Sequence, residues 1–258
     1  MFIDSHAHLT DERYTEGAEN IISKLKESGI DFIINVGYDE KSSEGSFNLS
    51  EKFSNVFAAV AVHPHDSKFA DDKSYGKFRT YAAGKNVVAI GETGLDYYYD
   101  HSPRETQKKV FVEHLKLADE LRLPVIIHLR DAFSDMLEIL RNNKSLLNNS
   151  GVLHSYSGSA ELVNEFLKFD LNFSFSGPVT FKNARGLLDT VKAVPLDRIL
   201  SETDCPYLTP EPFRGRLNYP AYVKETVKKI AEIKEVEVPV LCEIIKENTL
   251  RIFKKIKL

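Results

Sequence analysis

Residues 87–92 read VVAIGE, a short apolar run that ends in a carboxylate, and this stretch decides the fold. Its apolar residues follow one another without alternating with polar ones, which is typical of a strand covered on both faces. Similar runs, separated by longer amphipathic stretches, occupy residues 2–4, 32–36, 57–62, 125–128, 152–154, 171–175 and 199–202. Eight such strand-then-helix units predict an α/β protein with a single (β/α)₈ TIM barrel.

The length and composition favour one domain over residues 1–258. The chain has 42% hydrophobic and 28% charged residues, as globular proteins do, and no long linker or low-complexity segment divides it. Ser102 and Pro103 predict the N-cap and first position of a helix that ends before Pro124. Two further helices are predicted over 219–233 and 240–256, and the second adds a C-terminal helix beyond the eighth strand.

Charge, cysteine content and hydropathy exclude several classes of protein. Lys and Arg number 34 against 38 Asp and Glu, so a net charge of −4 gives no overall basic field for nucleic acid or anionic membranes. Any nucleic-acid contact is therefore expected to be local. The only cysteines, Cys205 and Cys242, form no paired-ligand spacing. The chain shows neither a signal sequence nor a membrane-spanning run, so a cytoplasmic location without membrane contact is expected.

Polar residues at the carboxyl ends of the predicted strands are the main functional signal. In a barrel these ends face one common mouth. The residues are His6, His8, His63, His65, Glu92, His128, His154, Glu202 and Asp204. The pair His6 and His8 lies on one side of an extended segment, a weak signal alone, but ligand-type residues at so many strand ends indicate a metal site. Imidazoles and carboxylates without nearby cysteine suit one or two divalent first-row ions.

The same residues fit a catalytic centre with two divalent ions, of Mg, Mn or Zn. Glu92 is the candidate for a bridging carboxylate, with His6, His8 and Asp204 holding one ion, and His128 and His154 the other. The ions would activate a water molecule as the nucleophile. Asp204 is expected to serve as ligand and general base, so Asp204 and Glu92 are the predicted catalytic residues.

Seven motifs, in chain order, carry a family resemblance across almost the whole sequence. They are IDSHAHL (3–9), VHPH (62–65), IGETGLDY (90–97), PVIIHLR (124–130), HSYSG (154–158), ETDCPYLTP (202–210) and RGRLNYP (214–220). With them the chain resembles the TatD family of metal-dependent deoxyribonucleases. Ala61, the pair Ser155 and Tyr156, and Cys205 depart from the family's usual residues, and none of these departures removes a ligand.

The resemblance implies an amidohydrolase-type barrel, a divalent-metal site and hydrolysis of phosphodiester bonds in DNA. It carries metal roles onto six positions, His6, His8, Glu92, His128, His154 and Asp204. The resemblance also implies that His63 and His65 contact the substrate. On residue chemistry alone, these two histidines can also bind a metal or form hydrogen bonds within a loop.

Further substrate contacts are expected at the rim of the mouth. Tyr98, within a run of three tyrosines after Glu92, is expected to stack on an exposed base, although these rings can also simply pack the loop. Arg130 and Arg214 are expected to bind phosphate. Lys182 and Arg185 are interpreted as solvated charges.

The leading prediction is a DNA phosphodiesterase, an exonuclease acting on single-stranded ends, without a membrane or an obligate protein partner. An amidohydrolase acting on a small cyclic amide is the first alternative, but it often bridges its metals through a lysine at the end of strand four, where Glu92 stands. Hydrolysis of an ester such as aminoacyl-tRNA stays open. A non-catalytic nucleic-acid binder is disfavoured, because it needs a basic face and no metal ligands.

Overall fold

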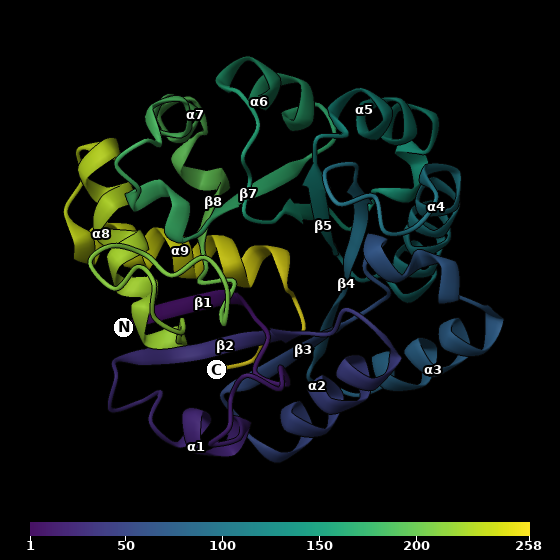
Figure 1. Ribbon diagram of the computed structural model, residues 1–258, viewed down its shortest axis with the longest axis horizontal. Helices are drawn as coiled ribbons and strands as arrows, with labels where there is room; N and C mark the ends of the chain where they lie inside the picture. The colour runs from purple at the N-terminus through teal and green to yellow at the C-terminus, as the bar shows by residue number, and fades with distance from the viewer.

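The computed structural model describes residues 1–258 and contains one sheet of eight strands, all parallel and in sequence order. The strands are β1 (Phe2–Ala7), β2 (Ile30–Val36), β3 (Val56–Val60), β4 (Val87–Asp96), β5 (Val125–Arg130), β6 (Gly151–Leu153), β7 (Leu171–Phe175) and β8 (Ile199–Ser201). They form a nearly closed barrel at the centre of the molecule (Figure 1). The predicted (β/α)₈ TIM barrel is therefore confirmed.

The first and last strands meet through few contacts. One parallel bridge pairs Ala7 with Cys205, beyond the end of β8. The hydroxyl of Ser5 donates to the Ser201 carbonyl at 3.0 Å, and the Ser201 hydroxyl donates to the Ile3 carbonyl at 3.1 Å. Side-chain hydroxyls thus replace part of the backbone ladder that joins the other neighbouring strands.

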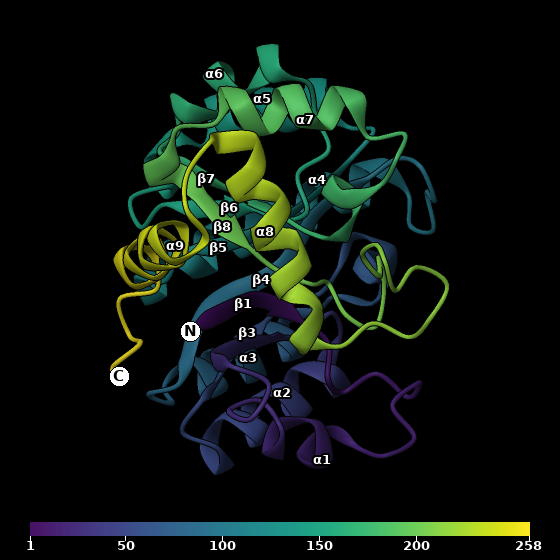
Figure 2. The same cartoon turned by 90° about the vertical axis from the view of Figure 1, so that its left-hand side faces the viewer.

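Helices cover the outside of the barrel (Figure 1). They are α1 (Ala18–Ser23), α2 (Glu40–Lys52), α3 (Asp72–Ala82), α4 (Arg104–Leu121), α5 (Phe133–Asn142), α6 (Ala160–Leu167), α7 (Arg185–Ala193), α8 (Val223–Lys234) and α9 (Val238–Ile252). Five short 3₁₀ helices occur at Pro64–Phe69, Lys144–Leu146, Gly177–Thr180, Leu196–Arg198 and Pro220–Tyr222. Figure 2 shows α8 and α9 beside β1 and β8. No helix combines the length and the apolar composition needed to cross a bilayer.

Three predicted helix starts differ from the structure. The helix predicted from residue 219 begins with the 3₁₀ helix Pro220–Tyr222 and becomes α-helical only at Val223, where α8 starts. The start of α4 at Arg104 leaves Pro103 at the N-cap without a side-chain cap. The Ser102 hydroxyl instead donates to the His65 carbonyl at 2.7 Å and accepts the Lys68 backbone N–H at 3.2 Å. The prediction for Ser102 was wrong because its hydroxyl bonds the 3₁₀ helix Pro64–Phe69 and does not cap α4. The start of α9 precedes Pro239, which lies in the first turn, where a missing N–H breaks no helical hydrogen bond.

The C-terminal segment closes the end of the barrel where the strands begin. Ile252, Phe253 and Ile256 belong to a buried apolar cluster of 14 residues, most of them from the strands. The Lys255 ammonium group donates to the carbonyls of Ala82, Gly84 and Val87 at 2.8, 2.8 and 3.0 Å. Since Val87 begins β4, this closure leaves the opposite end, where the strands finish, free for chemistry.

Phe253→Ala is expected to lower the free energy of unfolding by about 3–5 kcal/mol, because the ring is 1% exposed and fills the base of the barrel. Urea unfolding followed by circular dichroism measures this loss. The neighbouring exposed residue provides the control, since Lys254→Ala removes no buried contact. A loss below about 1 kcal/mol for Phe253→Ala would show that the segment does not complete the core.

Candidate metal centre

A pocket of about 620 Å³ opens at the carboxyl ends of the strands. Eight of the predicted site residues line it: His8, His63, His65, Glu92, His128, Arg130, His154 and Asp204. His6 lies fully buried at the end of β1, in contact with His8 and His154. Residues from six strands or the loops that follow them therefore converge at one mouth, as expected for a parallel barrel.

One side of the pocket floor brings together His6, His8, Glu92 and Asp204. His6 Nε2 lies 3.1 Å from His8 Nε2 and 3.3 Å from Glu92 Oε2. His8 Nε2 lies 3.5 Å from the same Glu92 oxygen and 3.3 Å from Asp204 Oδ1, while His6 Nε2 to Asp204 Oδ1 is 3.8 Å. Ligands of a tetrahedral Zn²⁺ at 2.0–2.1 Å lie about 3.3–3.4 Å from one another. The four atoms thus have the spacing of a coordination shell.

The donor chemistry of this group also fits a divalent cation. His8 Nδ1 lies 2.8 Å from the Val36 carbonyl, which places a proton on that nitrogen and leaves the Nε2 lone pair facing the carboxylates. The Nδ1 atom of His6 is buried without a hydrogen-bond partner. Imidazole nitrogens and carboxylate oxygens that face one another are acceptors in need of a shared positive charge.

The other side of the floor is built around the second oxygen of Glu92. Its Oε1 atom lies 2.7 Å from His128 Nδ1 and 2.7 Å from His154 Nε2, and these two nitrogens are 3.1 Å apart. His63 Nε2 lies 3.4 Å from the same oxygen. Glu92 therefore gives one oxygen to each half of the cluster, which is the arrangement that a bridging carboxylate needs.

The charge state of Glu92 favours cation binding. Burial opposes ionisation of this 3% exposed side chain, but His154 and His63 hold its pKa well below the usual range. Burial likewise opposes protonation of His154, yet Glu92 and Glu202 raise its pKa well above the usual value. The centre of the site is thus an ionised carboxylate surrounded by imidazoles, which a cation can bind by displacing protons.

His63 and His65 take different positions. His63 Nδ1 accepts the His65 backbone N–H at 3.1 Å, and burial lowers the pKa of His63 to about 4, so its neutral ring carries the proton on Nε2. The protonated nitrogen faces Glu92 across the pocket floor. His65 Nε2 lies 3.0 Å from Asp96 Oδ2.

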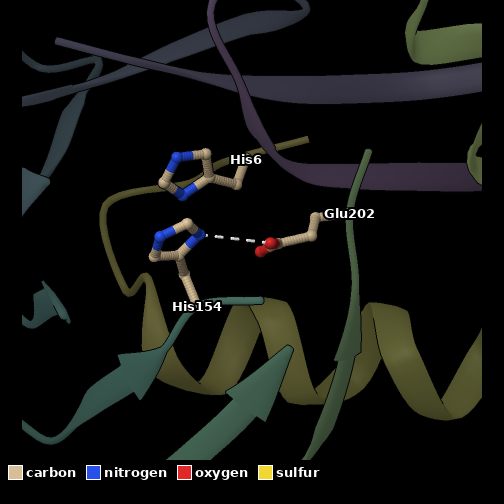
Figure 3. A group of neighbouring side chains, drawn as sticks. All are labelled: His6, His154 and Glu202. Atoms are coloured by element: carbon tan, nitrogen blue, oxygen red, sulfur yellow. Dashed lines mark hydrogen bonds and ion pairs between the residues drawn. The ribbon is translucent and has the colours of Figure 1, made fainter. Parts of the chain in front are cut away.

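Two buried carboxylates behind the cluster have no assigned role in the sequence prediction. Asp96 Oδ2 lies 3.0 Å from His128 Nε2, and Glu202 Oε1 lies 3.3 Å from His154 Nδ1. Figure 3 shows the Glu202 carboxylate facing His154, whose ring stacks with that of His6. The signal for Asp96 is its position four residues after Glu92, since residues separated by an even number along a strand share a face.

The predicted substrate contacts are only partly brought to the pocket. Arg130 lines it, and its guanidinium carbon lies 4.0 and 4.9 Å from the ring centroids of Tyr98 and Tyr99. Tyr99 belongs to the pocket lining, whereas Tyr98 lies outside it and is 59% exposed. Arg214 also lies outside the lining, with its guanidinium stacked on Phe181 at 3.8 Å.

Comparison with known proteins gives one consistent result. Residues 3–254 match the family model described as TatD related DNase. The chain is 41% identical to the uncharacterised metal-dependent hydrolase YabD of Bacillus subtilis over 98% of this chain and 99% of that one. It is 37% identical to the uncharacterised metal-dependent hydrolase YcfH of Escherichia coli K12, with 98% and 96% covered. The crystal structure of YjjV, a TatD homologue from Escherichia coli K12, superposes with a TM-score of 0.91 at 26% identity and 98% coverage of both chains.

Proposed function

This chain belongs to the family of TatD-related DNases, metal-dependent hydrolases that act on ester bonds, and on that premise we propose that it removes nucleotides from single-stranded ends of DNA. The observation that carries the proposal is the position of Glu92. Its two oxygens face two separate groups of imidazoles at the floor of one pocket. This arrangement suits phosphodiester hydrolysis, in which the attacking and leaving oxygens both need stabilisation.

Two divalent ions, Mg²⁺, Mn²⁺ or Zn²⁺, are proposed as cofactors. His6, His8 and Asp204 would hold one and His128 and His154 the other, with Glu92 shared between them. Bound there, the ions supply Lewis-acid stabilisation of the phosphate and lower the pKa of water. Asp204 is the proposed general base: its carboxylate is 13% exposed to the pocket, so it can accept a proton from a water molecule there.

His63 is proposed to contact the scissile phosphate. Its Nε2–H, fixed by the hydrogen bond at Nδ1, is a neutral donor at pH 7 and lies on the pocket wall. His65, held by Asp96, stands further out, where it can contact the next phosphate or a terminal hydroxyl. Both residues bind and orient the substrate in this proposal.

Tyr98→Ala is expected to weaken binding of a single-stranded oligonucleotide by about 1–3 kcal/mol, because the exposed ring offers a stacking face for a base. Arg130 lies over the ring and adds a positive charge for the backbone. Fluorescence anisotropy with a labelled oligonucleotide measures the affinity. Tyr98→Phe keeps the face and should bind normally, whereas equal binding by both variants would remove the stacking role.

Cleavage is expected to require an accessible end of a single strand. The candidate metal ligands lie at the floor of a pocket whose volume suits a nucleotide-sized ligand, which a frayed terminus can enter and a rigid duplex cannot. Labelled linear single strands, blunt duplexes and closed circular single strands, each with Mg²⁺ or Mn²⁺ and with or without chelator, test this directly. Linear single strands should be degraded fastest, and chelator should stop the reaction.

Rapid cutting of the circle would show that no end is needed and would remove the end-binding role of His63 and His65. The panel also includes a small cyclic amide and an aminoacyl-tRNA. Faster hydrolysis of either than of DNA would replace the proposed substrate while leaving the metal-dependent chemistry in place.

A further inference from the structure

The far nitrogens of the cluster histidines have different partners. Each imidazole that binds a metal keeps a second nitrogen, and the partner of that nitrogen decides which lone pair is free. His8 has the Val36 carbonyl there, and His6 has no partner. His128 and His154 each have a buried carboxylate instead.

Asp96 is surrounded by donors. Its Oδ1 atom accepts the backbone N–H groups of Tyr98 and Tyr99 at 3.0 and 2.9 Å. Its Oδ2 atom lies 3.0 Å from both His65 Nε2 and His128 Nε2. Gln107 fixes the backbone, accepting the Asp96 N–H at 2.8 Å and donating to its carbonyl at 3.1 Å. A carboxylate with four such neighbours is an acceptor only, so His128 donates from Nε2.

Glu202 contacts His154 at Nδ1, whereas Asp96 contacts His128 at Nε2. The carboxylate is fully buried, with Oε1 3.3 Å from His154 Nδ1 and Oε2 accepting the Ser174 hydroxyl (Figure 3). His154 then keeps the proton on Nδ1, and Nε2 is the nitrogen that can give up its proton to a cation. In His128 the corresponding nitrogen is Nδ1, and both nitrogens lie 2.7 Å from the same oxygen, Glu92 Oε1.

We propose that Asp96 and Glu202 are positioning residues that fix opposite tautomers of His128 and His154, so that Nδ1 of one and Nε2 of the other bind a single divalent cation. The inference rests on the proposed metal site but not on DNA as the substrate. Carboxylate partners of this kind raise the basicity of a histidine ligand and hold its ring in place.

The two carboxylates differ in whether an amide can replace them. In Asp96→Asn the two backbone N–H groups keep the oxygen, so the amide NH₂ faces His128 and pushes its proton to Nδ1, the nitrogen needed for the cation. In Glu202→Gln the amide oxygen can stay on His154, because the Ser174 hydroxyl can turn to accept from the NH₂ group. The variants remove equal charge, which makes Glu202→Gln a matched control for Asp96→Asn.

Cation affinity and stoichiometry are measured by titrating Mn²⁺ and Zn²⁺ into the purified protein by calorimetry, with chelator competition. Asp96→Asn should lower the affinity for one of the two ions by about 10–100-fold, and Glu202→Ala should do the same. Glu202→Gln should stay close to the unmodified protein. Equal weakening by Asp96→Asn and Glu202→Gln would mean that charge alone matters and would overturn the inference.

Nitrogen-15 NMR of histidine-labelled, Zn²⁺-loaded protein tests the tautomers without any substitution. His128 should show a metal-bound Nδ1 and a protonated Nε2, and His154 the reverse. Coordination of both through the same nitrogen would overturn the inference, whether or not the protein cleaves DNA. If both histidines bind as expected and no DNA is cleaved, the proposed substrate fails and the positioning roles stand.

Discussion

Glu92→Ala is expected to slow hydrolysis of labelled single-stranded DNA by at least about 10³-fold, because losing the shared carboxylate removes several kcal/mol of charge stabilisation. This is the largest effect expected of any substitution, since Glu92 alone faces both halves of the cluster. The rate and the number of bound ions are measured together on the same preparation. A variant that keeps two ions and a near-normal rate would remove Glu92 from the bridging position.

The Glu92 experiment needs a measure of folding, because the side chain is buried. Removing one partner from a buried charged network typically costs about 3–5 kcal/mol. Thermal unfolding in the presence of chelator is therefore measured alongside the kinetics. The rate is then calculated per mole of folded protein. Glu105→Ala, which removes an exposed carboxylate in the first turn of α4, should change neither the rate nor the ion count.

Asp204→Asn is expected to lower the rate of the chemical step by at least about 10²-fold, the usual effect of losing a general base. The amide keeps the shape of the side chain but loses the negative charge 3.3 Å from His8 Nε2 and cannot accept the proton. Affinity for DNA should fall much less, because the predicted contacts of His63, His65 and Arg130 lie elsewhere in the pocket and Tyr98 and Arg214 lie outside it.

Single-turnover kinetics separates the two effects of Asp204→Asn. An unchanged chemical step with weakened DNA binding would contradict the general-base role. The control is Asp197→Asn, which alters an exposed carboxylate at the opposite end of the barrel and should leave both steps intact.

The number, order and parallel direction of the strands could be predicted from sequence, because buried strands leave continuous apolar runs. The convergence of His6, Glu92 and His128 followed from the barrel alone, since the carboxyl ends of its strands share one mouth. The metal roles of these residues remain predictions. The TatD resemblance is confirmed by the family match and the relatives.

The partners behind the cluster could not be predicted, because they depend on where strands end. The sequence places the end of its fourth strand at Glu92, whereas β4 continues to Asp96 by pairing Leu95 and Asp96 with Leu129 and Arg130 of β5. Glu202 was recognised as a strand-end carboxylate, but its contact with His154 depends on which nitrogen faces it. Hydrogen-bond direction of this kind leaves no periodic trace in a sequence.

The weak junction between β1 and β8 gives the cluster a mechanical consequence. His6 and His8 lie on the β1 side of this junction and Asp204 lies on the β8 side. A cation bound by all three would therefore cross-link the two strands. Ligand binding stabilises only the state that binds the ligand. The bound cation would therefore stabilise the closed barrel at the junction that has the fewest backbone hydrogen bonds between strands. The His8 and Asp204 backbone N–H groups donate across this junction to the carbonyls of Cys205 and His6. Amide hydrogen exchange at His8 and Asp204 should then slow on adding Mn²⁺, while exchange in the continuous ladder between β2 and β3 stays unaffected.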